Sequence, residues 1–177
     1  MKTMITMTMM FYAAVAGMPA IAGTAAQPIS TMKTISKPGS PSVFPLGEEF
    51  SNGHFTGRVW LRMLSERDEM FRCPIGHVTF EPGCRNSWHR HPGGQILLCT
   101  AGAGYFQEKG KPIRLLRPGD TVRIAPGVQH WHGASPDSWF SHLSIETNAD
   151  RGAVEWLQPV TEEEYGSYRA ESDASGK

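Results

Sequence analysis

Residues 83–102 constrain the fold of this chain more than any other stretch, because two histidines and a glutamine lie among glycines at strand spacing. His89 and His91 are two residues apart, and residues i and i+2 of a β-strand project from the same face. The Gly-Gly pair after them allows the backbone to turn, so Gln95 can point back into the same pocket from the next strand. Two imidazoles on one face can chelate one metal ion. The stretch therefore predicts a metal site built on β-strands.

A second stretch of this kind follows, in which His130 comes eleven residues after Gly119. The two stretches together resemble the two conserved motifs of the cupin superfamily, carried here by Gly83, His89, His91, Gln95, Gly102, Gly119 and His130. Cupins usually have Glu at the position of Gln95, and the Asn often found after the second-motif histidine is replaced by Ala134. The resemblance implies a jelly-roll barrel that holds a divalent metal through His89, His91, Gln95 and His130.

The pattern of short apolar segments and turns agrees with such a barrel. Strands are expected over 55–63, 73–80, 87–91, 95–100, 104–108, 113–116, 121–125, 130–133 and 139–146. Short strands spaced about 8–12 residues apart are typical of a sandwich or barrel. A short C-terminal helix is expected over 162–169, with Thr161 as its N-cap. We therefore expect an all-β fold, a cupin double-stranded β-helix or jelly-roll barrel, as a single domain over residues 50–168.

The segments outside the barrel have other compositions. Residues 1–26 resemble an export signal, with an apolar run over 9–16 and small residues at its end. The protein is therefore expected in the periplasm or outside the cell, and in the cytoplasm if this segment is not a signal. Residues 27–49 are expected to form a linker or N-terminal arm, and residues 169–177 a flexible tail.

The charge balance limits the classes of partner. Lys plus Arg and Asp plus Glu are equal, at 17 each in 177 residues, so no net field attracts nucleic acid or an anionic membrane. The expected partner is a small-molecule substrate. The resemblance to cupins also implies a homodimer or homotetramer that associates through the outer faces of the barrel.

Further residues share the inward face with the expected metal ligands. His132 lies two residues after His130, and His142 lies on the last strand, so either could act as an acid or base beside the metal. Both are also typical of hydrogen-bonded core histidines. The expected pocket-lining residues are Thr79, Leu97, Cys99, Val122 and Ile124, each of which would equally suit plain core.

The expected ligand set carries no charge of its own. Three imidazoles and a carboxamide leave a divalent ion with its full charge, which makes it a stronger Lewis acid than in a site with a carboxylate. Mixed nitrogen and oxygen ligands without a thiolate suit Mn²⁺ or Fe²⁺, with Ni²⁺, Zn²⁺ or Cu²⁺ as alternatives.

A narrower resemblance covers Phe55 to Tyr165. The runs Val-Thr-Phe-Glu-Pro-Gly, Trp-His-x-His-Pro-x-Gly-Gln and His-Trp-His-Gly-Ala are similar to small bacterial manganese cupins with hydroxynitrile lyase activity. That likeness implies Mn²⁺ as the metal, cleavage of cyanohydrins or related small α-hydroxy compounds, and His142 and His132 as the acid/base groups. Three alternatives stay open: an Fe²⁺ dioxygenase or other oxidoreductase, a non-catalytic cupin that binds a metal or small ligand, and an isomerase or decarboxylase.

Overall fold

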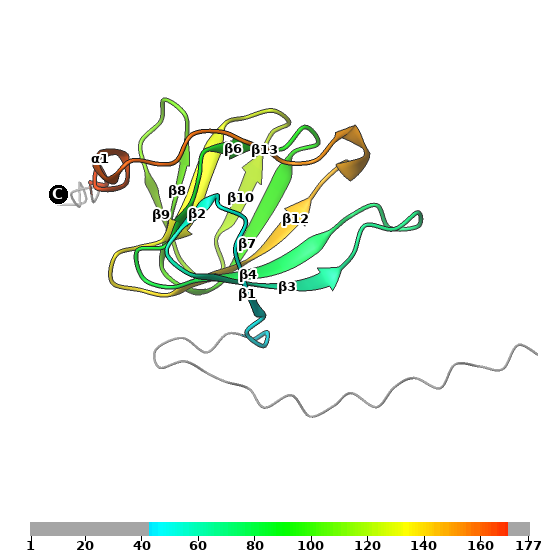
Figure 1. Ribbon diagram of the computed structural model, residues 1–177, viewed down its shortest axis with the longest axis horizontal. Coiled ribbons are helices and arrows are strands. Elements are labelled where there is room, and N and C mark those ends of the chain that lie inside the picture. Colours follow the sequence, from blue (N-terminus) through cyan, green and yellow to red (C-terminus); the bar gives the residue numbers. More distant parts are fainter. Residues whose placement is uncertain (1–42, 170–177) are drawn as a thin grey trace, which may run out of the picture. The chain divides into compact units, whose positions relative to one another are not determined.

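The computed structural model describes residues 43–169 (Figure 1). The predicted export signal over 1–26, most of the predicted arm over 27–49 and the tail from residue 170 lie outside the described residues. The described end of the arm already belongs to the barrel, because Glu48–Phe50 forms a strand, β1, that pairs with residues Val59–Leu61.

One sheet has six strands, all paired antiparallel. In spatial order they are β1, β3 (Val59–Ser65), β4 (Ile75–Phe80), β12 (Phe140–Glu146), β7 (Gln95–Gly102) and β10 (Thr121–Ile124). In β7 the burial alternates along all eight residues, with Gln95 and Leu97 buried and their neighbours half-buried. This alternation is the period expected when one face of a sheet packs on a core.

The second sheet is organised around β11 (His130–Ala134). Two short strands, β5 (Arg85–Asn86) and β6 (His89–Arg90), pair with β11 at different points. The remaining strands extend the sheet: β2 (Phe55–Thr56) beside β5, β13 (Glu155–Trp156) beside β6, β8 (Gly104–Glu108) beside β11, and β9 (Arg114–Leu116) beside β8.

The two sheets curl toward each other and enclose the core (Figure 1). The main buried cluster is apolar and contains Val59, Phe80, Cys84, Leu97, Cys99, Phe106, Leu116, Val122, Ile124, Ala134 and Phe140. The predicted all-β jelly roll with a short C-terminal helix is confirmed.

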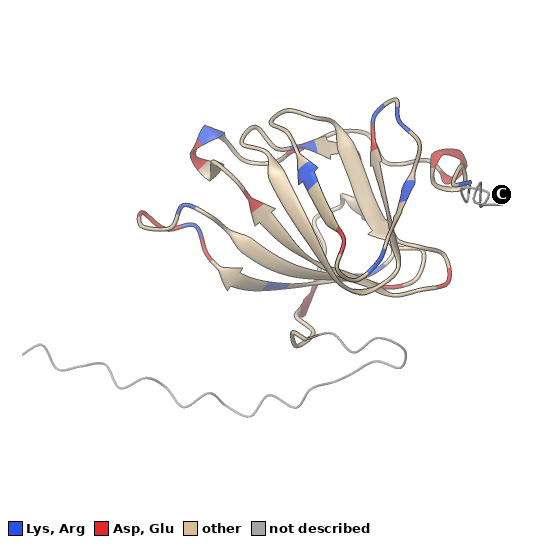
Figure 2. Cartoon of the chain, turned by 180° about the vertical axis from the view of Figure 1, so that it is seen from behind, with Lys and Arg blue, Asp and Glu red and all other residues tan. Residues whose placement is uncertain are grey.

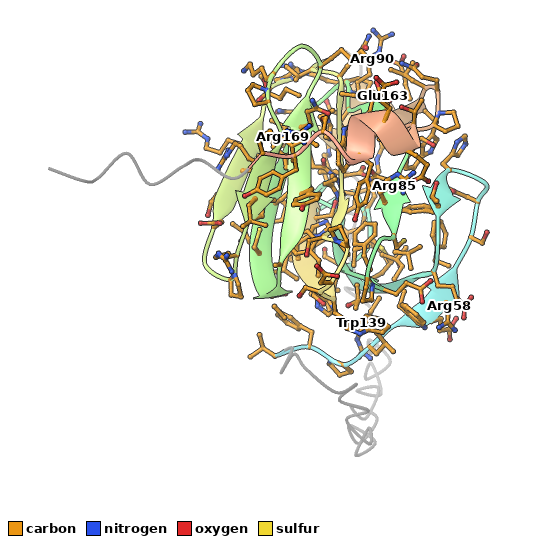
Figure 3. The ribbon with its side chains drawn as sticks, turned by 90° about the vertical axis from the view of Figure 1, so that its left-hand side faces the viewer. Arg58, Arg85, Arg90, Trp139, Glu163 and Arg169 are labelled. Atoms are coloured by element: carbon orange, nitrogen blue, oxygen red, sulfur yellow. The ribbon has the colours of Figure 1, made fainter. Side chains whose placement is uncertain are left out.

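The C-terminal helix α1 (Glu162–Tyr165) packs on the outer face of the second sheet (Figure 3). Thr161 caps it as predicted, in a reciprocal capping box with Glu164. The helix is shorter than the predicted 162–169 because Gly166, a poor helix former, follows Tyr165. The Tyr165 hydroxyl donates to the backbone oxygen of Ala134 at 2.8 Å, which attaches the helix to β11. A 3₁₀ turn over Ala149–Arg151 and the strand β13 were not expected.

Charged residues of both signs are interspersed at loops and strand ends (Figure 2). Among the described residues 43–169, no helix has the length and apolar character needed to cross a membrane.

Candidate metal centre

His89 and His130 lie directly opposite each other on the paired strands β6 and β11. Their ring centroids are 4.1 Å apart and both side chains are fully buried. The Nδ1 of His89 lies 2.9 Å from the carbonyl oxygen of Ser87. A carbonyl oxygen only accepts hydrogen bonds, so this Nδ1 carries the proton and Nε2 keeps a lone pair for a metal.

The ring of His130 has an oxygen atom next to each of its two nitrogens, and a neutral ring has too few protons to donate to both. The Nδ1 of His130 lies 2.9 Å from the oxygen of Val128, and its Nε2 lies 2.9 Å from Oε1 of Gln95. The amide is held in this orientation because Gln95 Nε2 donates to Ser144 Oγ at 2.8 Å. A neutral imidazole has only one N–H for these two oxygens.

The His130 ring does not take up a second proton at neutral pH, so it has no second N–H to donate to Gln95. Burial lowers the pKa of His130 to about 4, although its hydrogen bond to Val128 and the charge of Glu108 raise it. A cation between Nε2 of His130 and Oε1 of Gln95 would accept a lone pair from each. The donor atoms present therefore fit a metal ion.

His91 completes the set of predicted ligands. Its ring centroid is 5.3 Å from that of His89 and 5.9 Å from that of His130. Burial, followed by the charge of His130, lowers its pKa to about 4. The predicted turn after His91 is present, with Gly94 at a φ of 89° that favours glycine. The rings of His89, His91 and His130 therefore lie next to one another, and Gln95 contacts His130.

His132 also contacts this group. Ring nitrogens of His89, His130 and His132 all lie within 4.8 Å of one another, an alternative trio that could hold a metal. One ring nitrogen of His132 already has a partner, because Nδ2 of Asn86 lies 3.2 Å from its Nε2. Burial, followed by the charges of His142 and the other histidines, lowers the pKa of His132 well below its usual value.

His142 lies behind His132, away from the cavity wall. Its ring packs between Phe80 and Phe140, at centroid distances of 5.7 and 5.3 Å, and meets the His132 ring edge-on at 4.8 Å. Within the described residues neither of its ring nitrogens has a hydrogen-bond partner. Burial, with a smaller effect from His77, lowers the pKa of His142 to about 3. A buried polar ring without partners suggests a functional reason for its presence.

A cavity of about 220 Å³ opens onto the histidines. Its wall is mostly apolar and contains Phe50, Phe55, Leu61, Met63, Pro74, Val78, Phe80, Val154 and Trp156, while Asn52, Gly76, Asn86, His89, His91, Gln95, His132, Ser144 and Glu146 complete it.

The five residues expected to line this cavity lie elsewhere. Leu97, Cys99, Val122 and Ile124 belong to the closed apolar core, and Thr79 hydrogen-bonds Ser141 at 2.9 Å on the other face of β4. Leu97 and Cys99 do share the face of Gln95, but they lie further along β7, where core side chains fill the barrel.

Glu146 and Trp156 are two of the cavity residues that were not foreseen. Glu146 shares the face of His142 and Ser144 on β12, so the two-residue period extended by one step would have found it. Burial raises the pKa of Glu146, against a smaller lowering by Arg67. Trp156 lies 5.0 Å from His89 and is stacked on His54 at 4.7 Å. It was missed because β13 has only two residues and no recognisable pattern.

Comparisons with known proteins identify relatives of this barrel. The Cupin domain family matches residues 76–142. An (R)-mandelonitrile lyase from Granulicella tundricola is 43% identical over 111 residues, which cover 63% of this chain and 85% of that protein. A cupin-like protein from Thermotoga maritima is 47% identical, with a TM-score of 0.71 over 74% of this chain and 100% of that one. A cupin 2 conserved barrel domain protein from Rhodopseudomonas palustris shares the fold. It is 19% identical, with a TM-score of 0.54 over 62% of this chain and 75% of that one.

Proposed function

This chain belongs to the cupin superfamily, and we propose that it is a metal-dependent lyase that cleaves cyanohydrins or related small α-hydroxy compounds. The observation that carries the proposal is the contact between His130 Nε2 and Gln95 Oε1, two acceptors 2.9 Å apart beside a cavity. The identity to an (R)-mandelonitrile lyase supports the choice of reaction.

The proposed ligands are His89, His91, Gln95 and His130, and the proposed metal is Mn²⁺. His132 is left out because the Nδ2 amide of Asn86 is a donor, so it uses the one lone pair of the neutral His132 ring, whereas the carbonyl partners of His89 and His130 leave a lone pair for a metal. Four protein ligands leave open positions in an octahedral set, as a catalytic site requires. When bound, the ion would supply a Lewis acid that polarises the substrate hydroxyl.

The apolar wall of the cavity would hold the hydrocarbon part of the substrate and exclude water from it. Phe50, Phe55, Phe80 and Trp156 contribute aromatic rings to this wall. An α-hydroxyl group would then point toward the histidines, where Asn86 and Ser144 are the neighbouring neutral polar groups.

His132 and His142 would carry the proton as a pair. His132 lines the cavity, and His142 meets it edge-on with no hydrogen bond of its own in the described part of the chain. Their lowered pKa values keep both rings neutral at pH 7, which is the form that accepts a proton, and the burial that lowers these pKa values also makes both rings weak bases. The substrate hydroxyl gives its proton to this pair as the C–C bond breaks. Cyanide leaves with the bonding electrons and takes the proton back, so HCN and a carbonyl compound are released.

The direct test is HCN release from mandelonitrile by Mn²⁺-loaded protein. We expect release that stops after chelation, and a loss of about 10²–10⁴-fold in His132→Ala and His142→Ala. An absence of metal-dependent release would contradict the lyase. Oxygen uptake with Fe²⁺ would instead support a dioxygenase, and tight metal binding without turnover a binding protein.

A homodimer or homotetramer is also proposed, as is export to the periplasm or the medium. Sedimentation of the purified protein tests the first, and fractionation of expressing cells tests the second. A monomer, or protein confined to the cytoplasm, would contradict these two proposals without affecting the metal site.

A further inference from the structure

The last residue of β12, Glu146, contacts His91, and the two residues after it, Thr147 and Asn148, contact the loop between His91 and Gln95. This loop sets the spacing between two of the proposed metal ligands. The contacts are of two kinds, one to the backbone of the loop and one to the ring of His91.

The backbone contact converges on the carbonyl oxygen of Gly93. Thr147 donates to it from Oγ1 at 2.8 Å, and Asn148 donates from Nδ2 at 3.0 Å. The backbone N–H of Thr147 also donates to the oxygen of Gly94 at 3.2 Å. The approach is so close that a Cβ on Gly93 would lie 2.1 Å from the oxygen of Thr147. Asn148 has a φ of 45°, a left-handed conformation that asparagine tolerates better than most residues.

The second contact joins the carboxylate of Glu146 to His91. Oε1 of Glu146 lies 3.8 Å from Nδ1 of His91, and the Glu146 side chain is about one-third exposed, at 32%. For His89 and His130, the Nδ1 contact is a backbone carbonyl. For His91 the corresponding position is taken by this carboxylate. Among the described residues, Glu146 is also the only Asp, Glu, Lys or Arg side chain in the cavity wall.

We propose that residues 146–148 are a positioning element for His91. The Glu146 carboxylate lies 3.8 Å from Nδ1, beyond the range of a direct hydrogen bond, and its negative charge favours the proton on Nδ1, so that Nε2 faces the metal position. Thr147 and Asn148 hold the loop that carries the ring. A carboxylate behind a ligating histidine fixes its tautomer and raises its basicity, and removing such a partner typically costs about 10–100-fold in metal affinity. This inference rests on the proposed metal site and not on the proposed reaction.

The test is titration of chelator-treated protein with Mn²⁺, read by calorimetry, so that it needs no substrate. Glu146→Gln keeps the size of the side chain and removes its charge, and we expect the Kd for Mn²⁺ to rise about 10–100-fold. Glu146→Asp, which keeps the carboxylate, should recover part of the affinity. Thr147→Val, which removes one hydrogen bond to Gly93, should raise the Kd independently. Glu163→Gln on α1 is the matched control, since it removes an exposed carboxylate far along the chain from these residues (Figure 3).

The visible spectrum of the Co²⁺-loaded protein provides a second readout, because a shift in ligand orientation changes the absorption bands. We expect altered bands in Glu146→Gln and wild-type bands in Glu163→Gln. An unchanged Kd and spectrum in Glu146→Gln, alongside weakened binding in His91→Ala, would overturn the inference alone. A Glu146→Gln loss as complete as that of His91→Ala would make Glu146 a direct ligand and overturn its positioning role. A wild-type protein that binds no Mn²⁺ would overturn both this inference and the proposed function.

Discussion

Asn86 holds His132 at two points. Its Oδ1 accepts the backbone N–H of His132 at 2.9 Å, and its Nδ2 contacts the His132 ring at 3.2 Å. The two residues are 46 positions apart in sequence, on the paired strands β5 and β11. One amide side chain thus satisfies the backbone of β11 and fixes the ring that lines the cavity.

Replacing Asn86 by Ala should therefore affect stability and turnover but not metal binding. The buried N–H of His132 would lose its acceptor, and we expect the free energy of unfolding to fall by about 1–3 kcal/mol. HCN release should also fall, because the ring loses its orientation, while the Kd for Mn²⁺ stays within about twofold. Urea unfolding and Mn²⁺ titration check these outcomes. A large loss of Mn²⁺ affinity would indicate that His132, and not His91, is a ligand.

The second prediction concerns the uncharged amide at position 95. Gln95→Glu introduces a carboxylate beside the proposed ion, so Mn²⁺ should bind about tenfold more tightly or better. The same charge weakens the ion as a Lewis acid, and HCN release should become slower. Ser144→Ala is the companion variant, since it removes the hydrogen bond that orients the amide and leaves the charge unchanged. Weaker Mn²⁺ binding by Gln95→Glu would contradict the proposed role of Oε1.

The third prediction is a loss of stability of the metal-free protein in mild acid. The pKa values of His91, His130 and His142 lie at about 4, 4 and 3 in the fold, below the ordinary 6.5, so the unfolded chain binds more protons in between. Stability is complete above pH 6.5 and is lost as the pH falls toward 4. Each group contributes a slope of about 1.4 kcal/mol per pH unit. Urea unfolding at pH 7, 6 and 5 measures this, and a flat profile would contradict the burial of these rings.

The fourth prediction separates stability from function at His142. This ring lies between Phe80 and Phe140 with no hydrogen bond in the described part of the chain. His142→Leu removes the unpaired polar atoms at similar volume, so we expect the metal-free protein to gain about 1–3 kcal/mol of stability. Its acid slope should fall by about 1.4 kcal/mol per pH unit. HCN release should be lost. A destabilised variant that keeps its turnover would show that the ring has a packing role only.

The residues that the sequence placed best are those fixed by local spacing. Strand parity and one glycine turn predicted that His89, His91 and Gln95 share a pocket, and all three line the cavity. Motif spacing added His130, which contacts Gln95. Parity also gave His132 and His142 their inward faces, but it did not show that His142 lies behind His132.

Depth in the barrel is not a local property of the sequence. Leu97 shares the face of Gln95, yet the curl of the two sheets places it in the closed core instead of the cavity. Trp156 reaches the cavity from a two-residue strand after a 3₁₀ turn, and its position depends on pairing with β6. Such placements follow from strand register and sheet curvature, which the order of apolar and polar residues does not encode.

The central claim is that one metal ion is held by His89, His91, Gln95 and His130. The most direct measurement is anomalous diffraction at the manganese edge from crystals of the Mn²⁺-loaded protein. The account predicts one peak at about 2.0–2.3 Å from Nε2 of the three histidines and from Oε1 of Gln95. A peak bonded to His132 in place of His91, or no peak among these side chains, would contradict it.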